Sequence, residues 1–204
     1  YLWLEQELNL LNRKDQIIEA VIIKFKEEGF STDLTITEIA KSVDIGKSTV
    51  YEYFKSKDDV IKEALIKMSD YNTDRIINIK DIETMKFEEA FKIQLKILFQ
   101  IASESRMMFE VFSKDFQNQL PSGIQSELMC KIHDVKDLIE QRFILIMVKG
   151  VTEGLISMDQ DPLSVNIMSG LVVGSMLRYS VSDSNLDLDK FVEKVYEAFL
   201  KLGN

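Results

Sequence analysis

The chain has 204 residues, of which 46% are hydrophobic, with a formal net charge of −9 and a single cysteine. This hydrophobic content argues against a disordered chain, and one cysteine cannot form an internal disulfide, which fits a reducing compartment. The longest apolar run, FILIMV at 143–148, is too short to span a bilayer, and residues 1–11 lack the features of a secretory signal. We therefore expect a cytoplasmic protein that is not embedded in a membrane.

Glycine and proline are scarce, at 8 and 2 residues, and Leu, Ile, Lys and Glu are abundant. This composition favours an all-α fold of one or two domains. The first predicted helix covers residues 12–28: Asn12 can cap it, and Gly29 ends it. Its apolar stripe consists of Ile17, Ile18, Val21, Ile22 and Phe25.

Residues 35–54 have the pattern of a helix-turn-helix. Thr35 and Glu38 have capping-box spacing and predict the start of a helix whose apolar positions recur at helical spacing up to Val43. Asp44 and Gly46 tolerate the backbone angles of a tight turn. A second helix then covers residues 47–54, with Val50 and Phe54 facing inward, and another begins after Ser56.

The outer side of this second helix carries side chains that suit DNA contacts. Hydroxyls can bind phosphates and base edges, and a tyrosine ring can pack against a thymine methyl. Lys57, beside a helix start, is placed to bind a phosphate. An ordinary helical corner with a solvated polar face would show a similar spacing. The candidate DNA-binding residues are Thr35, Thr37, Lys47, Ser48, Thr49, Tyr51, Tyr53 and Lys57.

The amino-acid sequence of the motif resembles the DNA-binding domain of the tetracycline-repressor (TetR) family over residues 13–65. The matching residues are Thr35, Ile39, Ala40, Lys47, Thr49, Tyr51, Tyr53, Phe54, Ser56 and Lys57. Asp44 and Gly46 depart from the family, which usually has Gly and Ser there, and Glu52 adds an acid to the recognition helix. The resemblance implies a transcriptional regulator that binds DNA, with a larger helical domain behind the DNA-binding one.

The net charge of −9 is unusual for a DNA-binding protein. Binding depends on the local field, however, within about 8 Å at physiological salt. Residues 47–57 contain three lysines and one acid, a local charge of +2 (3 − 1). We therefore expect binding to rely on dimerisation and on hydroxyl and backbone contacts.

We expect residues 1–56 to form a small three-helix DNA-binding domain and residues 57–204 a larger helical domain for ligand binding and dimerisation. A helix from 57 should continue toward Ile77, with a break at 78–85. Further helices are expected at 87–102, 124–149, 162–180 and 188–202, with a shorter segment rich in Met and Phe at 106–117.

The last two predicted helices suggest a dimer interface. Gly170 and Gly174 would let another helix approach closely, although packing within one chain would use the same pattern. The TetR resemblance implies dimerisation through the last long helices, so that two recognition helices reach successive major grooves. The candidate interface residues are Gly170, Leu171, Gly174, Leu177, Phe191, Val195 and Phe199.

Methionine and aromatic residues are dense in the middle of the chain. They can fill a core, or they can line a cavity for apolar ligands. The resemblance implies an effector cavity in this domain. The candidate ligand residues are Phe99, Met107, Phe112, Phe116, Met129, His133 and Phe143.

No sequence motif for an enzyme, a cofactor or a metal is present. Cys130 and His133 share a predicted helix face, but two ligands do not make a zinc site. The sequence thus predicts a homodimeric repressor that binds a palindromic operator and is released by a small apolar or amphipathic effector. The alternatives are an adaptor that binds a protein partner, an activator, and an all-helical enzyme with an apolar substrate.

Overall fold

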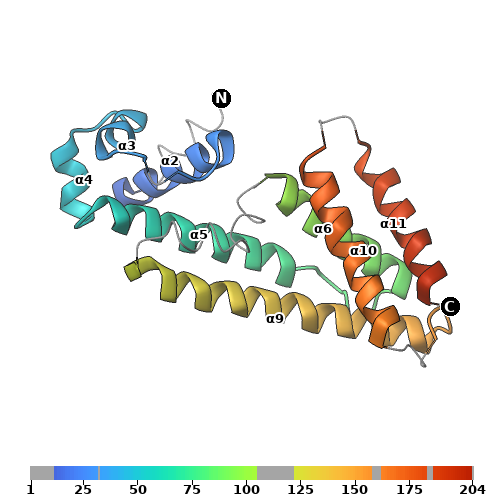
Figure 1. Ribbon diagram of the computed structural model, residues 1–204. Helices are drawn as coiled ribbons and strands as arrows, with labels where there is room; N and C mark the ends of the chain where they lie inside the picture. The colour runs from blue at the N-terminus through green and yellow to red at the C-terminus, as the bar shows by residue number, and fades with distance from the viewer. Residues whose placement is uncertain (1–11, 32, 105–121, 158–161, 183–185, 204) are drawn as a thin grey trace. The chain divides into compact units, whose positions relative to one another are not determined.

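A computed structural model describes residues 12–31, 33–104, 122–157, 162–182 and 186–203. Over these residues the chain forms eight α-helices and no strand, which confirms the all-α prediction (Figure 1). None of the described helices is both long and apolar enough to cross a membrane. The Met- and Phe-rich segment at 106–117 lies outside the described residues.

The chain divides into two compact units. The first holds the described residues up to Tyr71 together with 122–132, and the second holds the remaining residues from Asn72 onward. Helices α5 (Lys57–Ile77) and α9 (Ser122–Thr152) each contribute residues to both units. The expected division into domains at 1–56 and 57–204 stays a prediction.

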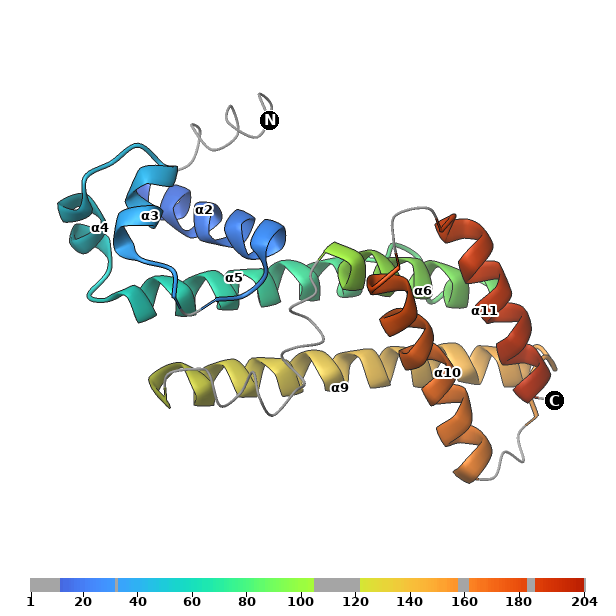
Figure 2. The ribbon, with the colours of Figure 1, turned by 45° about the horizontal axis from the view of Figure 1, so that its top comes forward.

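The first unit is built on α2 (Arg13–Glu28), α3 (Ile36–Ser42), α4 (Lys47–Tyr53) and the start of α5 (Figure 2). As expected, the side chain of Asn12 caps α2 by accepting a hydrogen bond from the backbone N–H of Asp15. Gly29 ends the helix with φ of 85°, a left-handed angle that glycine adopts without strain. The core side chains of the unit are Ile17, Ile18, Val21, Ile22, Phe25, Leu34, Ile39, Val50, Phe54, Ile61, Leu65 and Met68.

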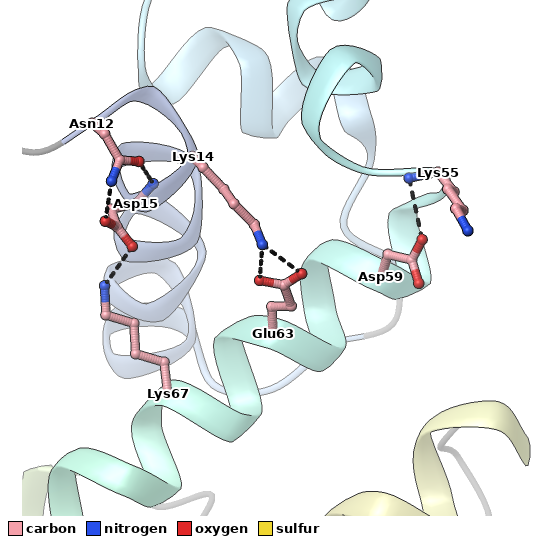
Figure 3. A network of polar contacts seen from close by, with 7 residues as sticks. All are labelled: Asn12, Lys14, Asp15, Lys55, Asp59, Glu63 and Lys67. Atoms are coloured by element: carbon pink, nitrogen blue, oxygen red, sulfur yellow. Dashed lines mark hydrogen bonds and ion pairs between the residues drawn. The ribbon is translucent and has the colours of Figure 1, made fainter.

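Ion pairs fasten α2 to α5 within this unit (Figure 3). The Lys14 Nζ lies 2.6 Å from a Glu63 carboxylate oxygen, and the Lys67 Nζ lies 3.2 Å from an oxygen of Asp15. Burial lowers the pKa of Lys67, but its hydrogen bonds to Asp15 and Glu19 outweigh that effect, so the pKa is raised overall. These pairs join the two helices that precede and follow α3 and α4 in the chain.

The second unit has an aromatic core around α6 (Phe87–Glu104). Both α10 (Pro162–Ser180) and α11 (Leu188–Gly203) pack against α6, which is the packing within one chain that the sequence offered as the alternative to a dimer interface. The ring of Phe91 lies 4.5 Å from that of Phe199 and 5.8 Å from that of Tyr196, measured between centroids. Such tilted aromatic pairs contribute packing energy beyond the area they bury.

Two basic residues of α9 secure the segment between α5 and α6, where the predicted break at 78–85 is confirmed. The guanidinium of Arg142 donates to the backbone oxygen of Ile77 at the end of α5, at 2.5 Å. The Lys149 Nζ donates to the backbone oxygen of Met85 at 3.1 Å. These bonds satisfy carbonyls that have no partner within a helix.

Candidate nucleic-acid interface

The start of α3 is fixed by a complete capping box. The Thr35 hydroxyl accepts from the N–H of Glu38 at 3.2 Å, and the Glu38 carboxylate accepts from the N–H and hydroxyl of Thr35 at 2.7 and 2.8 Å. Both hydrogen bonds from Thr35 lower the pKa of Glu38, and the one from the backbone N–H has the larger effect. The predicted capping box is confirmed, and the Thr35 hydroxyl is occupied by it.

The turn between α3 and α4 is formed by the two residues that the sequence singled out. Asp44 adopts φ of 50°, a left-handed angle that Asp tolerates better than most residues. Next to it, the N–H of Ile45 donates to the oxygen of Ala40 at 3.0 Å. Gly46 then precedes α4 in an extended conformation and provides no side-chain cap. The first N–H groups of α4 are therefore not covered by a capping side chain.

Helix α4 has one buried side and one exposed side. Val50 and Phe54 are buried at 0% and 3% exposure and anchor the helix to the unit, as predicted. Tyr51 and Tyr53 are exposed at 56% and 44%. Large exposed aromatic rings are costly to leave in water, and here they lie on the side away from the core. The other predicted DNA-binding residues of the helix-turn-helix are placed as follows: Lys47, Ser48, Thr35 and Thr37 are exposed, and Thr49 is half-buried.

The residues after α4 begin the next helix. The Ser56 hydroxyl accepts from the N–H of Asp59 at 3.1 Å, which caps α5, while the Asp59 carboxylate accepts from the N–H of Lys55 at 3.2 Å. Figure 3 shows Lys55 and Asp59 at this helix start. Lys57 is the first residue of α5 and is half-buried, so it is less accessible than expected for a phosphate contact.

The charge on this part of the unit is moderately positive. Residues 41–57 contain four lysines and two acids, a net charge of +2 (4 − 2). Lys41 and Lys55 are both exposed, and the candidate residues derived from the sequence did not include them. Lys55 was one of the three lysines counted in residues 47–57 but was not named as a candidate, and extending the count toward the N-terminus would have found Lys41. The exposed hydroxyls, tyrosine rings and lysines give this surface the groups that bind phosphates and base edges.

The predicted ligand residues that the structure describes lie in different surroundings. Phe99 is fully buried in the second unit, where its ring stacks on that of Tyr179 at 5.6 Å. Phe143 is half-buried and meets Phe91 edge-on at 6.3 Å. His133 is exposed, and Met129 is half-buried in the first unit. Met107, Phe112 and Phe116 lie outside the described residues. The assignment of these residues to a ligand stays a prediction.

The predicted dimer residues fall into two groups. Gly170 and Gly174 are exposed, with nothing within 4 Å of where a Cβ would lie, and Leu177 is 48% exposed. Val195 and Phe199, in contrast, are buried in the chain's own core, and Leu171 and Phe191 pack against that core. Only the α10 group therefore offers surface to a second copy.

A further exposed apolar group was missed from the sequence. Ile144, Leu145 and Val148 of α9 are 62%, 54% and 58% exposed. The FILIMV run at 143–148 contained this signal, but the run alone does not say which of its side chains face outward.

The described parts of the chain contain no group of three or more His, Cys, Asp or Glu side chains that could hold a metal ion.

Comparison with known proteins supports the resemblance seen in the motif. Residues 17–64 match the family described as "Bacterial regulatory proteins, tetR family". The chain is 21% identical over 131 residues to the "Biofilm operon icaADBC HTH-type negative transcriptional regulator IcaR" of Staphylococcus epidermidis, covering 64% of this chain and 67% of that protein. It is 26% identical over 115 residues to the protein of the same name from Staphylococcus aureus, covering 55% of this chain and only 61% of that protein.

A solved structure resembles the chain over nearly its full length. The transcriptional regulator FadR from Bacillus subtilis, in complex with stearoyl-CoA, has a TM-score of 0.62 and 20% sequence identity. The alignment covers 92% of this chain and 98% of that one. At this identity the likeness shows a shared fold, in which an N-terminal helix-turn-helix is followed by a larger helical region.

Proposed function

The chain belongs to the TetR family of bacterial transcriptional regulators, and from this premise we propose that it is a cytoplasmic, homodimeric repressor of a palindromic operator. A small apolar or amphipathic effector releases it from the DNA. The IcaR relatives are named negative regulators, which supports repression over activation.

The exposed side of α4 carries this proposal. Four of its side chains that can contact DNA, Lys47, Ser48, Tyr51 and Tyr53, are exposed, while Val50 and Phe54 hold the helix from behind. A helix of this kind fits the major groove, where hydroxyls and tyrosine rings meet base edges and a lysine meets phosphate. Glu52 is also exposed and would have to lie away from the phosphates or accept from a cytosine amine.

The case for a homodimer comes from the charge and from α10. A local charge of +2 gives a single recognition helix little electrostatic affinity, so two half-sites are needed for tight binding. Helix α10 is apolar on both sides, and a helix that is apolar all round is normally buried. Leu163, Ile167, Val173 and Leu177 are exposed and share one side of the helix. A second copy that packs its own α10 on this surface would cover them.

The effector part of the proposal is supported by the second unit and by FadR. The core of this unit is aromatic and aliphatic, which suits an apolar ligand. FadR of B. subtilis, which shares the fold, was solved with stearoyl-CoA, a molecule with a long apolar chain. Effector binding would favour a dimer whose recognition helices no longer match the half-site spacing, and such coupling is commonly about 1–3 kcal/mol.

A selection of duplexes from a random library, followed by binding titrations over a series of salt concentrations, tests DNA recognition. Lys47→Ala should weaken binding to the selected duplex and flatten the salt dependence by roughly one unit of slope, because one phosphate contact is lost. Lys80→Ala, an exposed lysine of the second unit, is the control and should leave the slope unchanged. If no duplex is enriched, the repressor hypothesis is refuted, and the result favours an adaptor that binds a protein partner.

Sedimentation tests the dimer. Val173→Lys places a charge on the exposed side of α10, where Val173 is 59% exposed, so the monomer should fold while the dimer dissociates. Gln100→Lys, on the exposed side of α6, is the control and should remain dimeric. A Val173→Lys protein that stays dimeric at micromolar concentration would place the interface elsewhere.

A further inference from the structure

Gln94 of α6 is an unusual residue for the place it occupies. Its side chain is 0% exposed, and among the described residues it is the one polar or charged residue that is buried. Neither the Oε1 nor the Nε2 of its amide has a hydrogen-bond partner in the described structure. Buried polar groups in native proteins are nearly always paired, so an amide with both ends unpaired calls for an explanation.

The position of Gln94 on the helix gives the first clue. One turn before it, Ala90 and Phe91 belong to the large aromatic cluster of the second unit. One turn after it, Leu98 belongs to a separate cluster that also contains Ile76. Residues three and four apart share one side of a helix, so Gln94 lies between the two clusters on the buried side of α6. The hydrophobic interior of this unit is thus interrupted by one amide.

The surroundings of this junction are apolar and partly adaptable. Three half-buried side chains pack against both clusters and so border the junction: Ile97, Phe143 and Met176. Methionine is flexible and adapts to different shapes, which lets a packed interior open for a ligand. Phe143 was among the ligand residues expected from the sequence.

The chemistry of the junction restricts what can bind there. An amide offers one acceptor and a donor group, and a hydroxyl, an amide or a carbonyl can pair with it. No Lys, Arg, His, Asp or Glu side chain is buried among the described residues, so these residues offer no counter-charge to a buried carboxylate or ammonium group. Burying an unpaired charge is far more costly than burying a neutral polar group with a hydrogen bond.

We propose that Gln94 binds the effector, and that the effector part that reaches it is an apolar chain carrying an uncharged hydrogen-bonding group. This inference rests on the proposed function, because it specifies the class of effector. The apolar chain lies between the two clusters, and its hydroxyl, amide or carbonyl pairs with the Gln94 amide. Gln94 thus selects for molecules with a neutral polar group over the matching acids.

Calorimetric titration without DNA tests the proposal with three probes of equal chain length: decan-1-ol, decanamide and decanoate. The wild-type protein should bind the alcohol and the amide, and at pH 8 it should bind decanoate more weakly. Gln94→Met keeps the length of the side chain and removes both polar atoms. It should weaken binding of decan-1-ol by about fivefold, the value of one hydrogen bond. Gln100→Met, the same change on the exposed side of α6, should bind as the wild type does.

Thermal denaturation shows whether the variant is folded. Gln94→Met should melt no lower than the wild type, because an apolar group replaces an unpaired buried amide. If it does not fold, Gln94→Leu takes its place in the same titrations. An amide that only holds a buried water would leave the affinity for decan-1-ol equal in the wild type and in Gln94→Met, and this result would overturn the proposal. Failure of both neutral probes to bind the wild type, or equal binding of decanoate, would overturn it as well.

Operator binding separates this inference from the proposed function. If the neutral probes bind in a Gln94-dependent way and leave operator affinity unchanged, the Gln94 site stands and effector release is refuted. If another compound releases the operator equally from the wild type and from Gln94→Met, the repressor stands and the Gln94 site is refuted.

Discussion

The polar groups that distinguish the first unit lie on its surface, whereas the aromatic rings and the amide that distinguish the second unit are buried. In the first unit, the capping box of Thr35 and the ion pair of Lys14 with Glu63 are exposed or half-buried. In the second unit, Phe91 and Phe99 are fully buried, and so is Gln94 on the same helix. A change on the outside of the first unit should therefore alter binding and leave the fold intact, while a change inside the second unit should alter stability.

The largest effect is expected for Phe91→Ala, because its ring contacts Phe87, Phe143, Tyr196 and Phe199. Emptying such a site should destabilise the second unit by roughly 3–5 kcal/mol. Gln100→Ala, on the exposed side of the same helix, should change stability by less than about 0.5 kcal/mol. Urea denaturation measures both. A similar loss for the two variants would mean that the aromatic cluster is not the main support of this unit.

A smaller effect is expected for Gly150→Ala. A Cβ at Gly150 would lie 2.5 Å from the Cδ1 of Ile156 and 3.0 Å from the Phe87 ring, which is fully buried. The resulting overpacking should cost about 1–3 kcal/mol. Gly170→Ala is the matched control, since nothing lies within 4 Å of its Cβ position, and it should not destabilise the monomer. A Gly150→Ala protein that melts like the wild type would show that the core there can rearrange.

The helix cap in the first unit should have a smaller effect still. Thr35→Ala removes the side chain that caps α3 and should cost roughly 0.5–2 kcal/mol. Thr37→Ala, one residue inside the same helix and exposed, should be nearly neutral for stability. Thermal denaturation compares the two, and equal melting temperatures would show that the cap does not limit the stability of this unit.

Acid should weaken the same cap. The hydrogen bonds from Thr35 lower the pKa of Glu38 below its ordinary value of 4.5. A lowered pKa contributes stability that is present above pH 4.5 and is lost as the pH falls through the folded-state pKa. Because Glu38 is exposed, we expect a small effect, seen as a difference between wild type and Glu38→Gln that shrinks in acid. A difference that is constant from pH 7 to pH 3 would contradict this role of the carboxylate.

The sequence predicted the first unit better than the second for a physical reason. Thr35, Asp44 and Gly46 act through their own backbone neighbours, so short-range patterns are enough to locate the helices and the turn. For Val195 and Phe199 the sequence was not enough, because an apolar stripe on α11 has the same spacing whether it packs against α6 or against a second copy of the chain. Gln94 was missed for a similar reason. Its position on the buried side of α6 can be derived from helical spacing, but the lack of a partner depends on every element packed around it.

The most direct test of the account compares two tyrosines of the first unit on the selected duplex. Tyr51 on α4 is 56% exposed, and Tyr71 on α5 is 57% exposed, with its ring 5.7 Å from the Lys26 ammonium. We predict that Tyr51→Ala weakens duplex binding by about 5- to 150-fold, as expected for the loss of about 1–3 kcal/mol of base contact, and that Tyr71→Ala binds as the wild type does. Circular dichroism should show both variants folded. Equal affinities for Tyr51→Ala and Tyr71→Ala would contradict the claim that the exposed side of α4 reads DNA.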